Sequence, residues 1–117
     1  MLALLNQEPG YKTVEAYLPN YIMSTVNVAE VLTVLTQINI DVRESFAKIH
    51  CLINKIINFD AKQALLVGEL RTITKDLGLS VGDRSCLALA IHNKLPVITA
   101  DQILCKLSLD VEIKAIR

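Results

Sequence analysis

The spacing of apolar residues changes repeatedly along this chain, and each change predicts a switch between helix and strand. Runs with a period of about 3.6 residues indicate helices, and short runs rich in β-branched residues indicate strands. The pattern predicts helices at about residues 1–7, 11–18, 27–38, 42–53, 60–77, 80–93 and 101–107. It predicts strands at about residues 21–26, 55–59, 96–99 and 111–116.

Apolar stripes show which face of each predicted helix should be buried. The stripes of the third, fourth and fifth helices are Val28, Val31, Leu32, Leu35 and Ile38; Val42, Phe46, Ile49 and Ile53; and Leu66, Leu70, Ile73 and Leu77. Residues 87–91 are apolar on every side of their helix, so we expect this segment to be buried between neighbouring elements. Gly78 is expected to end the fifth helix.

Strands that alternate with helices are typical of a parallel sheet covered by helices on both faces. The predicted fold class is therefore α/β, a three-layer α/β/α arrangement with a parallel sheet. The length of 117 residues fits a single domain over residues 1–117.

Charge and composition narrow the function classes. The chain has 12 basic and 12 acidic residues, and this balance argues against a dedicated nucleic-acid binder but not against a nuclease with an acidic active site. No apolar run approaches the roughly 20 residues that span a bilayer, and the apolar start is too short for a secretory signal. We expect a soluble, cytoplasmic protein without membrane association, whose three cysteines are buried thiols.

Three acidic residues each lie where an apolar run gives way to a helical pattern: Glu30, Asp83 and Asp101. In an open α/β sheet the carboxyl ends of parallel strands converge on one edge, where ligands bind. Carboxylates gathered there repel one another unless a cation neutralises them, and Mg²⁺ prefers oxygen ligands. The pattern therefore outlines a metal-dependent phosphodiesterase, and a fourth acid, Asp60, occupies a similar position.

Helix capping explains the same acids without any metal. The spacings Asn27-x-x-Glu30 and Ser80-x-x-Asp83 both fit a capping box, with Asn27 or Ser80 as the N-cap residue. Asp101 fits a plain N-cap, and negative charge in a first helical turn suits the helix dipole. Spacing alone leaves both interpretations open.

A receiver-like phosphoacceptor also places acids at the edge of a parallel sheet. It would need clustered acids after the first strand and a lysine after the last strand. The sequence shows neither arrangement, so this alternative is the weaker interpretation.

Four short sequence blocks point to a known family. In order along the chain they are NQEPG at residues 6–10, STVNVAEV at 24–31, GDRSCLALA at 82–90 and PVITAD at 96–101. Their order and spacing closely resemble a PIN domain of the VapC type, the toxin half of bacterial type II toxin–antitoxin pairs. The resemblance covers nearly the whole chain.

The resemblance implies an Mg²⁺- or Mn²⁺-dependent endoribonuclease that cleaves structured RNA, forms a homodimer and is silenced by a cognate antitoxin. By resemblance, Glu30, Asp83 and Asp101 match the second, third and fourth acids of the family's catalytic and metal-binding quartet. Asp83 is the best candidate for direct metal contact. Thr99 matches the hydroxyl residue that supports the cluster, and Asn27 is expected to support it as well.

The chain departs from the family pattern at its start. The family begins with a central strand that ends in the first acid, and the register of residues 8–10 places that acid before Met1. We therefore expect a PIN-like domain that lacks its central strand, with weakened Mg²⁺ binding and unpaired strand edges. Either the start is misplaced or the gene has decayed; the alternative function is an inactive remnant that keeps only an antitoxin-binding or dimerisation surface.

Overall fold

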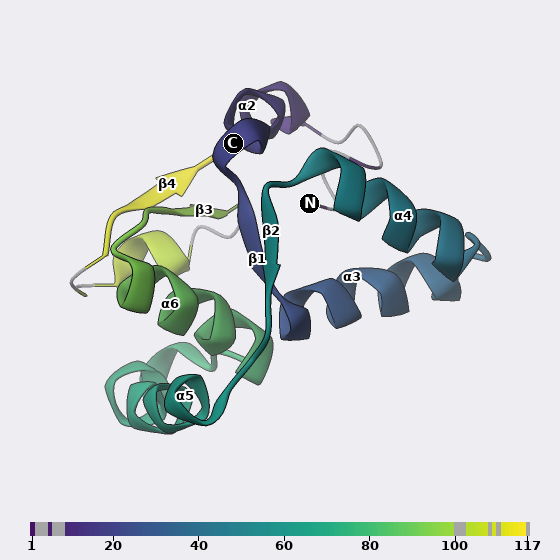
Figure 1. Cartoon of the computed structure of the whole chain (residues 1–117). Coiled ribbons are helices and arrows are strands. Elements are labelled where there is room, and N and C mark those ends of the chain that lie inside the picture. The colour runs from purple at the N-terminus through teal and green to yellow at the C-terminus, as the bar shows by residue number, and fades with distance from the viewer. Residues whose placement is uncertain (2–4, 6–8, 100–102, 108, 110, 117) are drawn as a thin grey trace. The chain divides into compact units, whose positions relative to one another are not determined.

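The computed structural model describes residues 1, 5, 9–99, 103–107, 109 and 111–116, and it divides the chain into two compact units. Unit 1 comprises Met1–Asn58 and unit 2 comprises Phe59–Arg117. Both units contain helices together with a pair of parallel strands (Figure 1). The predicted α/β fold class is therefore confirmed.

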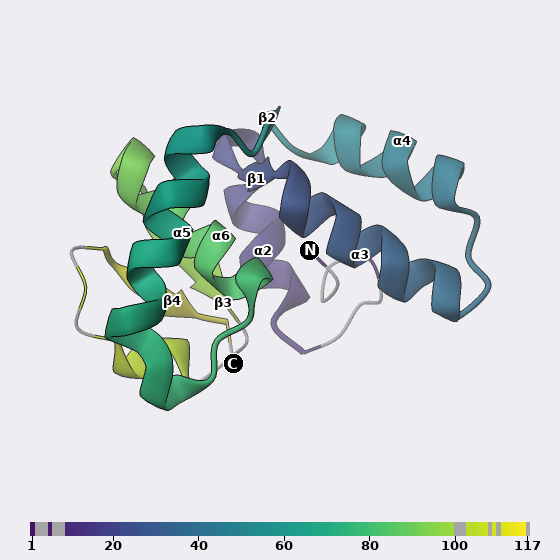
Figure 2. The ribbon, with the colours of Figure 1, turned by 90° about the horizontal axis from the view of Figure 1, so that it is seen from below.

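Unit 1 contains two long helices that lie side by side and one pair of parallel strands (Figures 1 and 2). Its elements, in which η marks a 3-10 helix, are α2 (Tyr11–Tyr17), η1 (Leu18–Asn20), β1 (Ile22–Ser24), α3 (Thr25–Gln37), α4 (Val42–Leu52) and β2 (Lys55–Ile57). Met23 of β1 lies opposite Ile56 of β2. The core of the unit consists of Met23, Val28, Val31, Leu35, Ile49 and Ile53.

In unit 2, helix α6 packs against both α5 and β3 (Figure 1). The elements of the unit are α5 (Ala61–Thr74), η2 (Lys75–Leu77), α6 (Val81–Asn93), β3 (Val97–Thr99), η3 (Leu104–Lys106) and β4 (Ile113–Ala115). Ile98 of β3 lies opposite Lys114 of β4 in the second parallel pair. The core of this unit consists of Val67, Leu70, Leu79, Leu87, Ala88, Ala90, Val97 and Leu104.

Helix α6 is the element that the sequence predicted best. It begins after Ser80 and ends at Asn93, as expected. Its apolar segment is buried, with Leu87 and Ala88 both 0% exposed. A helix enclosed in this way is held firmly, and it carries Asp83 in its first turn.

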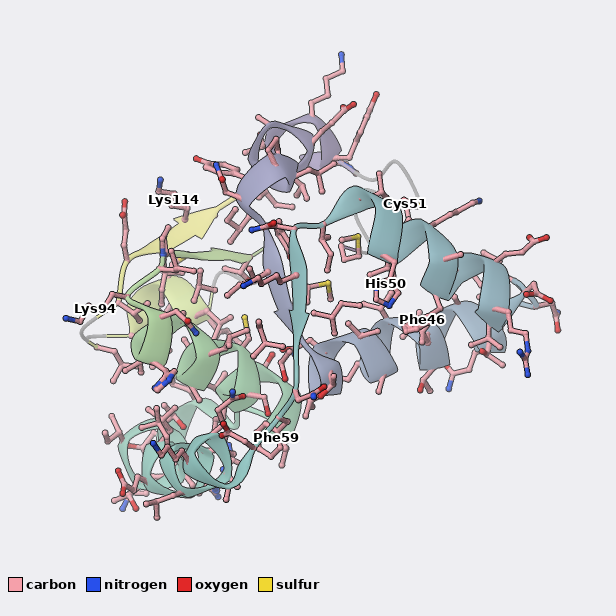
Figure 3. All side chains as sticks on the ribbon, viewed as in Figure 1. Phe46, His50, Cys51, Phe59, Lys94 and Lys114 are labelled. Atoms are coloured by element: carbon pink, nitrogen blue, oxygen red, sulfur yellow. The ribbon has the colours of Figure 1, made fainter. Side chains whose placement is uncertain are left out.

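Helix α4 buries only the second half of its predicted stripe, Ile49 and Ile53. Val42 and Phe46 are exposed, and Ser45 is buried. The hydroxyl of Ser45 donates to the carbonyl oxygen of Asp41 at 2.8 Å, so the helix itself satisfies this buried polar group. Phe46 instead places its ring edge against the ring of His50, with the centroids 4.5 Å apart (Figure 3).

Helix α5 buries Leu70 of its predicted stripe and half-buries Leu66 and Leu77, but its fourth member faces solvent. Ile73, a member of the predicted stripe, is 63% exposed, whereas Gln63 and Thr74 are buried. The hydroxyl of Thr74 donates to the carbonyl oxygen of Leu70 at 2.8 Å, which makes its burial tolerable. Apolar residues occur on both faces of this helix, so periodicity could not select the buried one.

Within the described residues the parallel strands form two pairs, one in each unit. Within the described residues, β1 is bonded only to β2 and β3 only to β4. The predicted helix at residues 1–7 lies mostly outside the described residues, as does the start of the one at 101–107. Each unit therefore has its own carboxyl strand edge.

The cysteines are less buried than predicted. Cys51 and Cys105 are exposed and Cys86 is half-buried, and none of the three forms a disulfide. The expectation of buried thiols is therefore wrong for Cys51, which lies on α4 (Figure 3), and for Cys105.

A membrane span would need a long apolar helix. Among the helices of the described part of the chain, none has the length and hydropathy to cross a bilayer.

Candidate functional site

Helix α3 carries Asn27 and Glu30 beyond the carboxyl end of β1. The last strand residue, Ser24, is also the N-cap of α3: its Oγ accepts a hydrogen bond from the backbone N–H of Val26 at 3.2 Å. The predicted capping box with Asn27 as N-cap is wrong, because the helix already begins at Thr25. Asn27 lies in the first turn of α3 and Glu30 in the second.

Glu30 is an exposed carboxylate held by its neighbour on the helix. Its Oε1 accepts a hydrogen bond from Nδ2 of Asn27 at 3.1 Å. A residue in the second turn does not cap the free N–H groups at the start of a helix, so capping does not explain Glu30. The second carboxylate oxygen, Oε2, is suited to accept from water or to bind a cation.

Asp83 takes part in the predicted capping box at the start of α6. Its backbone N–H donates to Oγ of Ser80, and its Oδ2 accepts from the backbone N–H of Ser80, both at 3.1 Å. The cap interpretation of Asp83 is therefore confirmed. The cap uses Oδ2, one of the two carboxylate oxygens of Asp83. A metal contact through the other oxygen, Oδ1, is therefore compatible with the cap.

Arg84, which the sequence analysis did not single out, fixes the start of α6 against α5. Its terminal guanidinium nitrogen donates to the carbonyl oxygen of Val67 at 2.9 Å. The guanidinium is half-buried, and its Nε has no hydrogen-bond partner within the described residues. This bond holds the first turn of α6, which also carries Asp83, against α5.

Thr99 lies at the same end of unit 2 as Asp83. The connection at residues 94–96 reverses the chain, so α6 and β3 run in opposite directions (Figure 1). The carboxyl end of β3, where Thr99 is half-buried, is therefore on the side where α6 begins. The carbonyl oxygen of Thr99 accepts from the N–H of Ile116 at 2.9 Å. Asp101, two residues further on, lies outside the described residues.

Two acids outside the predicted site act as simple N-caps. Oδ1 of Asp41 accepts from the N–H of Glu44, and Oδ1 of Asp60 accepts from the N–H of Gln63, both at 2.9 Å. Capping is therefore a sufficient explanation for Asp60, whose position had resembled that of the site acids. Asp41 stands directly before a helical pattern, and this position alone could have predicted its N-cap role.

The donor chemistry of these residues fits Mg²⁺ or Mn²⁺, because hard cations prefer carboxylate oxygens. Glu30 belongs to unit 1 and Asp83 to unit 2. Within the described residues, no three His, Cys, Asp or Glu side chains form a group that could hold a metal ion. The structure thus brings Asp83 and Thr99 to one end of unit 2, and it leaves the predicted three-acid cluster untested.

The whole arrangement can be compared with known families. Residues 1–109 match the PIN domain family, a match that covers most of both units. The chain belongs to the PIN domain family. No curated protein and no solved structure matches it.

PIN domains are generally metal-dependent nucleases, so membership indicates a nuclease whose family typically uses divalent metal ions. The predicted recognition of a PIN domain is confirmed, as is the PIN-like α/β fold class. The roles of Glu30, Asp83, Asp101, Thr99 and Asn27 stay predictions.

Proposed function

We propose that this PIN domain is a metal-dependent endoribonuclease and the toxin of a type II toxin–antitoxin pair. The observation that carries the proposal is the family match over residues 1–109, which indicates a nuclease. The four sequence blocks support the finer assignment, because their order and spacing resemble the VapC type. The same resemblance supports RNA as substrate, a cognate antitoxin as partner and a homodimer. The apolar pattern of the sequence supports action in the cytoplasm.

Asp83, Asp101 and Glu30 are the proposed catalytic and metal-binding carboxylates. Asp83 is proposed to contact the cation through Oδ1, while its Oδ2 keeps the start of α6 capped. Glu30 and Asp101 are proposed to hold metal-bound water or a second ion. When bound, Mg²⁺ or Mn²⁺ supplies an activated water and neutralises charge on the scissile phosphate.

Two neighbours are proposed to support these carboxylates. Asn27 restrains Glu30 through the 3.1 Å hydrogen bond to Oε1, which limits the directions that the carboxylate can take. Thr99 ends β3 at the end of unit 2 where α6 begins, and its hydroxyl is proposed to support the Asp83 carboxylate.

Substitution of Asp83 by Asn separates the metal role from the capping role. Asn keeps an oxygen that accepts from the N–H of Ser80 but loses the charge that a cation needs. With the 117-residue chain and Mn²⁺, we expect Asp83→Asn to lower the rate of RNA cleavage by about 100-fold or more, with little loss of thermal stability. Isothermal titration with Mn²⁺ should show weaker binding in the same variant.

Asp41→Asn is the matched control, because it makes the same change in a carboxylate that caps the start of a different helix, α4. It should leave both cleavage and Mn²⁺ binding unchanged. If the unaltered chain leaves RNA intact in Mn²⁺ and Asp83→Asn changes nothing, the nuclease proposal fails, and the inactive remnant becomes the better account.

A further inference from the structure

Two exposed cations are neighbours at the carboxyl end of α5. Arg71 and Lys75 are four residues apart, so they lie on the same side of the helix, about 6 Å apart along its axis. Lys75 directly follows α5 and keeps helical backbone angles. Val67, one turn before Arg71, is buried in the core of unit 2. Arg71 therefore stands at the edge of the face that packs into this core.

Arg84 adds a third cation at the same place. Its terminal guanidinium nitrogen donates to the carbonyl oxygen of Val67 at 2.9 Å. In a regular α-helix this oxygen also accepts from the N–H of Arg71, so the Arg84 guanidinium lies beside the backbone of Arg71. We call Arg84, Arg71 and Lys75 the cationic row. It starts beside the first turn of α6, which carries Asp83.

The acids of this part of α5 lie away from the cationic row. Glu69 is exposed and comes two residues before Arg71, which places it about 160° around the helix axis. Asp76 is exposed and comes seven residues after Glu69, so it falls toward the side of Glu69. Positive charge is therefore segregated on the side of Arg71 and Lys75, and a surface of this kind attracts anions.

Helix dipoles explain only part of this arrangement. Arg71 and Lys75 suit the negative, carboxyl end of α5. Arg84 lies near the start of α6, at the positive end of that helix, where a cation is unfavourable. Its guanidinium is half-buried, and its Nε has no hydrogen-bond partner within the described residues. Like charges held this close repel one another, and a bound anion would offset the repulsion.

The composition of unit 2 favours phosphate contacts over contacts to bases. Among residues 59–117, Phe59 is the only Phe, Tyr or Trp, and it packs against the core of the unit. Proteins that hold single-stranded RNA by stacking need aromatic rings on which the bases can lie. Arginine and lysine bind phosphate oxygens, and such contacts position a nucleic acid without reading its sequence. The anion that fits the row best is the RNA backbone.

We propose that the cationic row binds phosphates of the RNA substrate and holds the strand beside Asp83. This role rests on the proposed nuclease function, which supplies RNA as the substrate. Arg71 and Lys75 are the exposed substrate-binding residues, and Arg84 joins the row to the first turn of α6. Binding through such contacts is independent of base sequence and depends strongly on salt.

Fluorescence anisotropy with a labelled single-stranded RNA of mixed sequence tests the proposal. A chelator in the buffer removes divalent cations, so binding is measured apart from cleavage. The double variant Arg71→Gln/Lys75→Gln should bind about tenfold more weakly at low salt. The slope of log affinity against log salt concentration should become shallower by about 1.4, since each lost phosphate contact of a single strand accounts for about 0.7. Both side chains are exposed, so the melting temperature should change little.

Two further variants separate the row from general charge. Lys62→Gln is the matched control, because Lys62 is exposed on the same helix but lies about 180° around the axis from Arg71. It should leave both the affinity and the salt slope unchanged. The exchange Arg71→Lys/Lys75→Arg keeps both charges in place and should retain the salt slope of the unaltered chain.

Cleavage kinetics in Mn²⁺ supply a second readout. The double variant should raise KM about tenfold and leave kcat within about twofold, because contacts away from the scissile phosphate stabilise the bound substrate and the transition state equally. Asp83→Asn should instead lower kcat. A residue with only a structural role in α5 would not divide the two constants in this way.

Three results would overturn the proposal. The unaltered chain may bind no RNA, the double variant may keep the affinity and salt slope of the unaltered chain, or Lys62→Gln may lose as much affinity as Arg71→Gln alone. If the unaltered chain cleaves RNA in the second or third case, the nuclease function stands without the cationic row. A chain that binds RNA through the row but cleaves none in Mn²⁺ would support the row and refute the nuclease function.

Discussion

At the scale of single residues, two residues of the described part of the chain that are not glycine have a left-handed backbone. Asn39 has φ 64° and Lys94 has φ 54°. After α6, the N–H of Leu95 donates to the carbonyl oxygen of Ala90 at 3.0 Å, which is the closing bond of a Schellman motif. Asn39 ends α3 in the same way. Lysine rarely takes this conformation, so the sequence did not signal a helix end of this kind at Lys94 (Figure 3).

Lys94→Gly should stabilise the protein. Removing the Cβ relieves the unfavourable left-handed conformation, and we expect the free energy of unfolding to rise by about 1 kcal/mol in urea titrations. Asn39→Gly should give a smaller gain, because Asn tolerates the left-handed region better. Lys94→Ala keeps the Cβ and should give none. Equal stabilities of the Gly and Ala variants at residue 94 would contradict the strained conformation.

Helix capping and metal binding in this fold both favour an acidic residue near the start of a helix. Spacing identified the cap role of Asp83 because Ser80 stands three residues before it. The same argument failed for Glu30, because Ser24 provided an earlier cap. Spacing could not decide which of these acids also meets a cation, since that depends on residues far apart in the chain.

At the scale of elements, local hydrogen bonds determine where each helix begins, whereas tertiary packing determines which face of the helix is buried. The Ser24 hydroxyl is fully buried and caps α3 directly at the end of β1. The hydroxyl groups of the buried residues Ser45 and Thr74 donate hydrogen bonds to backbone carbonyl oxygens four residues earlier in the chain. Such residues can face a core at little cost, so apolar periodicity alone predicted the buried faces of α4 and α5 only in part.

Ser24→Ala tests the observed start of α3. The substitution removes the acceptor for the N–H of Val26, and it should lower the free energy of unfolding by about 1 kcal/mol in urea titrations. Asn27→Ala removes only a side-chain bond to the exposed Glu30 and should cost less. A larger loss for Asn27→Ala than for Ser24→Ala would instead favour Asn27 as the cap.

At the scale of the whole molecule, the chain is divided into two units that each have a core and a strand pair. Ile49 lies in the core of unit 1 and Leu87 in the core of unit 2, and both are 0% exposed. The family match nevertheless covers most of both units. The nuclease assignment therefore belongs to the chain as a whole and not to either unit.

Core truncations should show how independent the two units are. Ile49→Ala and Leu87→Ala should each lower the free energy of unfolding by about 2–4 kcal/mol, because both leave a cavity in a closed core. Amide hydrogen exchange should lose protection mainly in residues 9–58 for Ile49→Ala and in residues 59–99 for Leu87→Ala. An equal loss across the chain for both variants would show instead that the units unfold together.

The sequence alone determined the α/β class, the extent of α6 and the PIN resemblance, because these depend on local periodicity, capping residues and short motifs. The tertiary structure decided which faces of α4 and α5 are buried, that the strands pair in twos, and that Ser24 caps α3. The buried faces and the strand pairing depend on contacts between segments distant in sequence, and the Ser24 cap depends on where β1 ends. Apolar spacing along the chain carries neither kind of information.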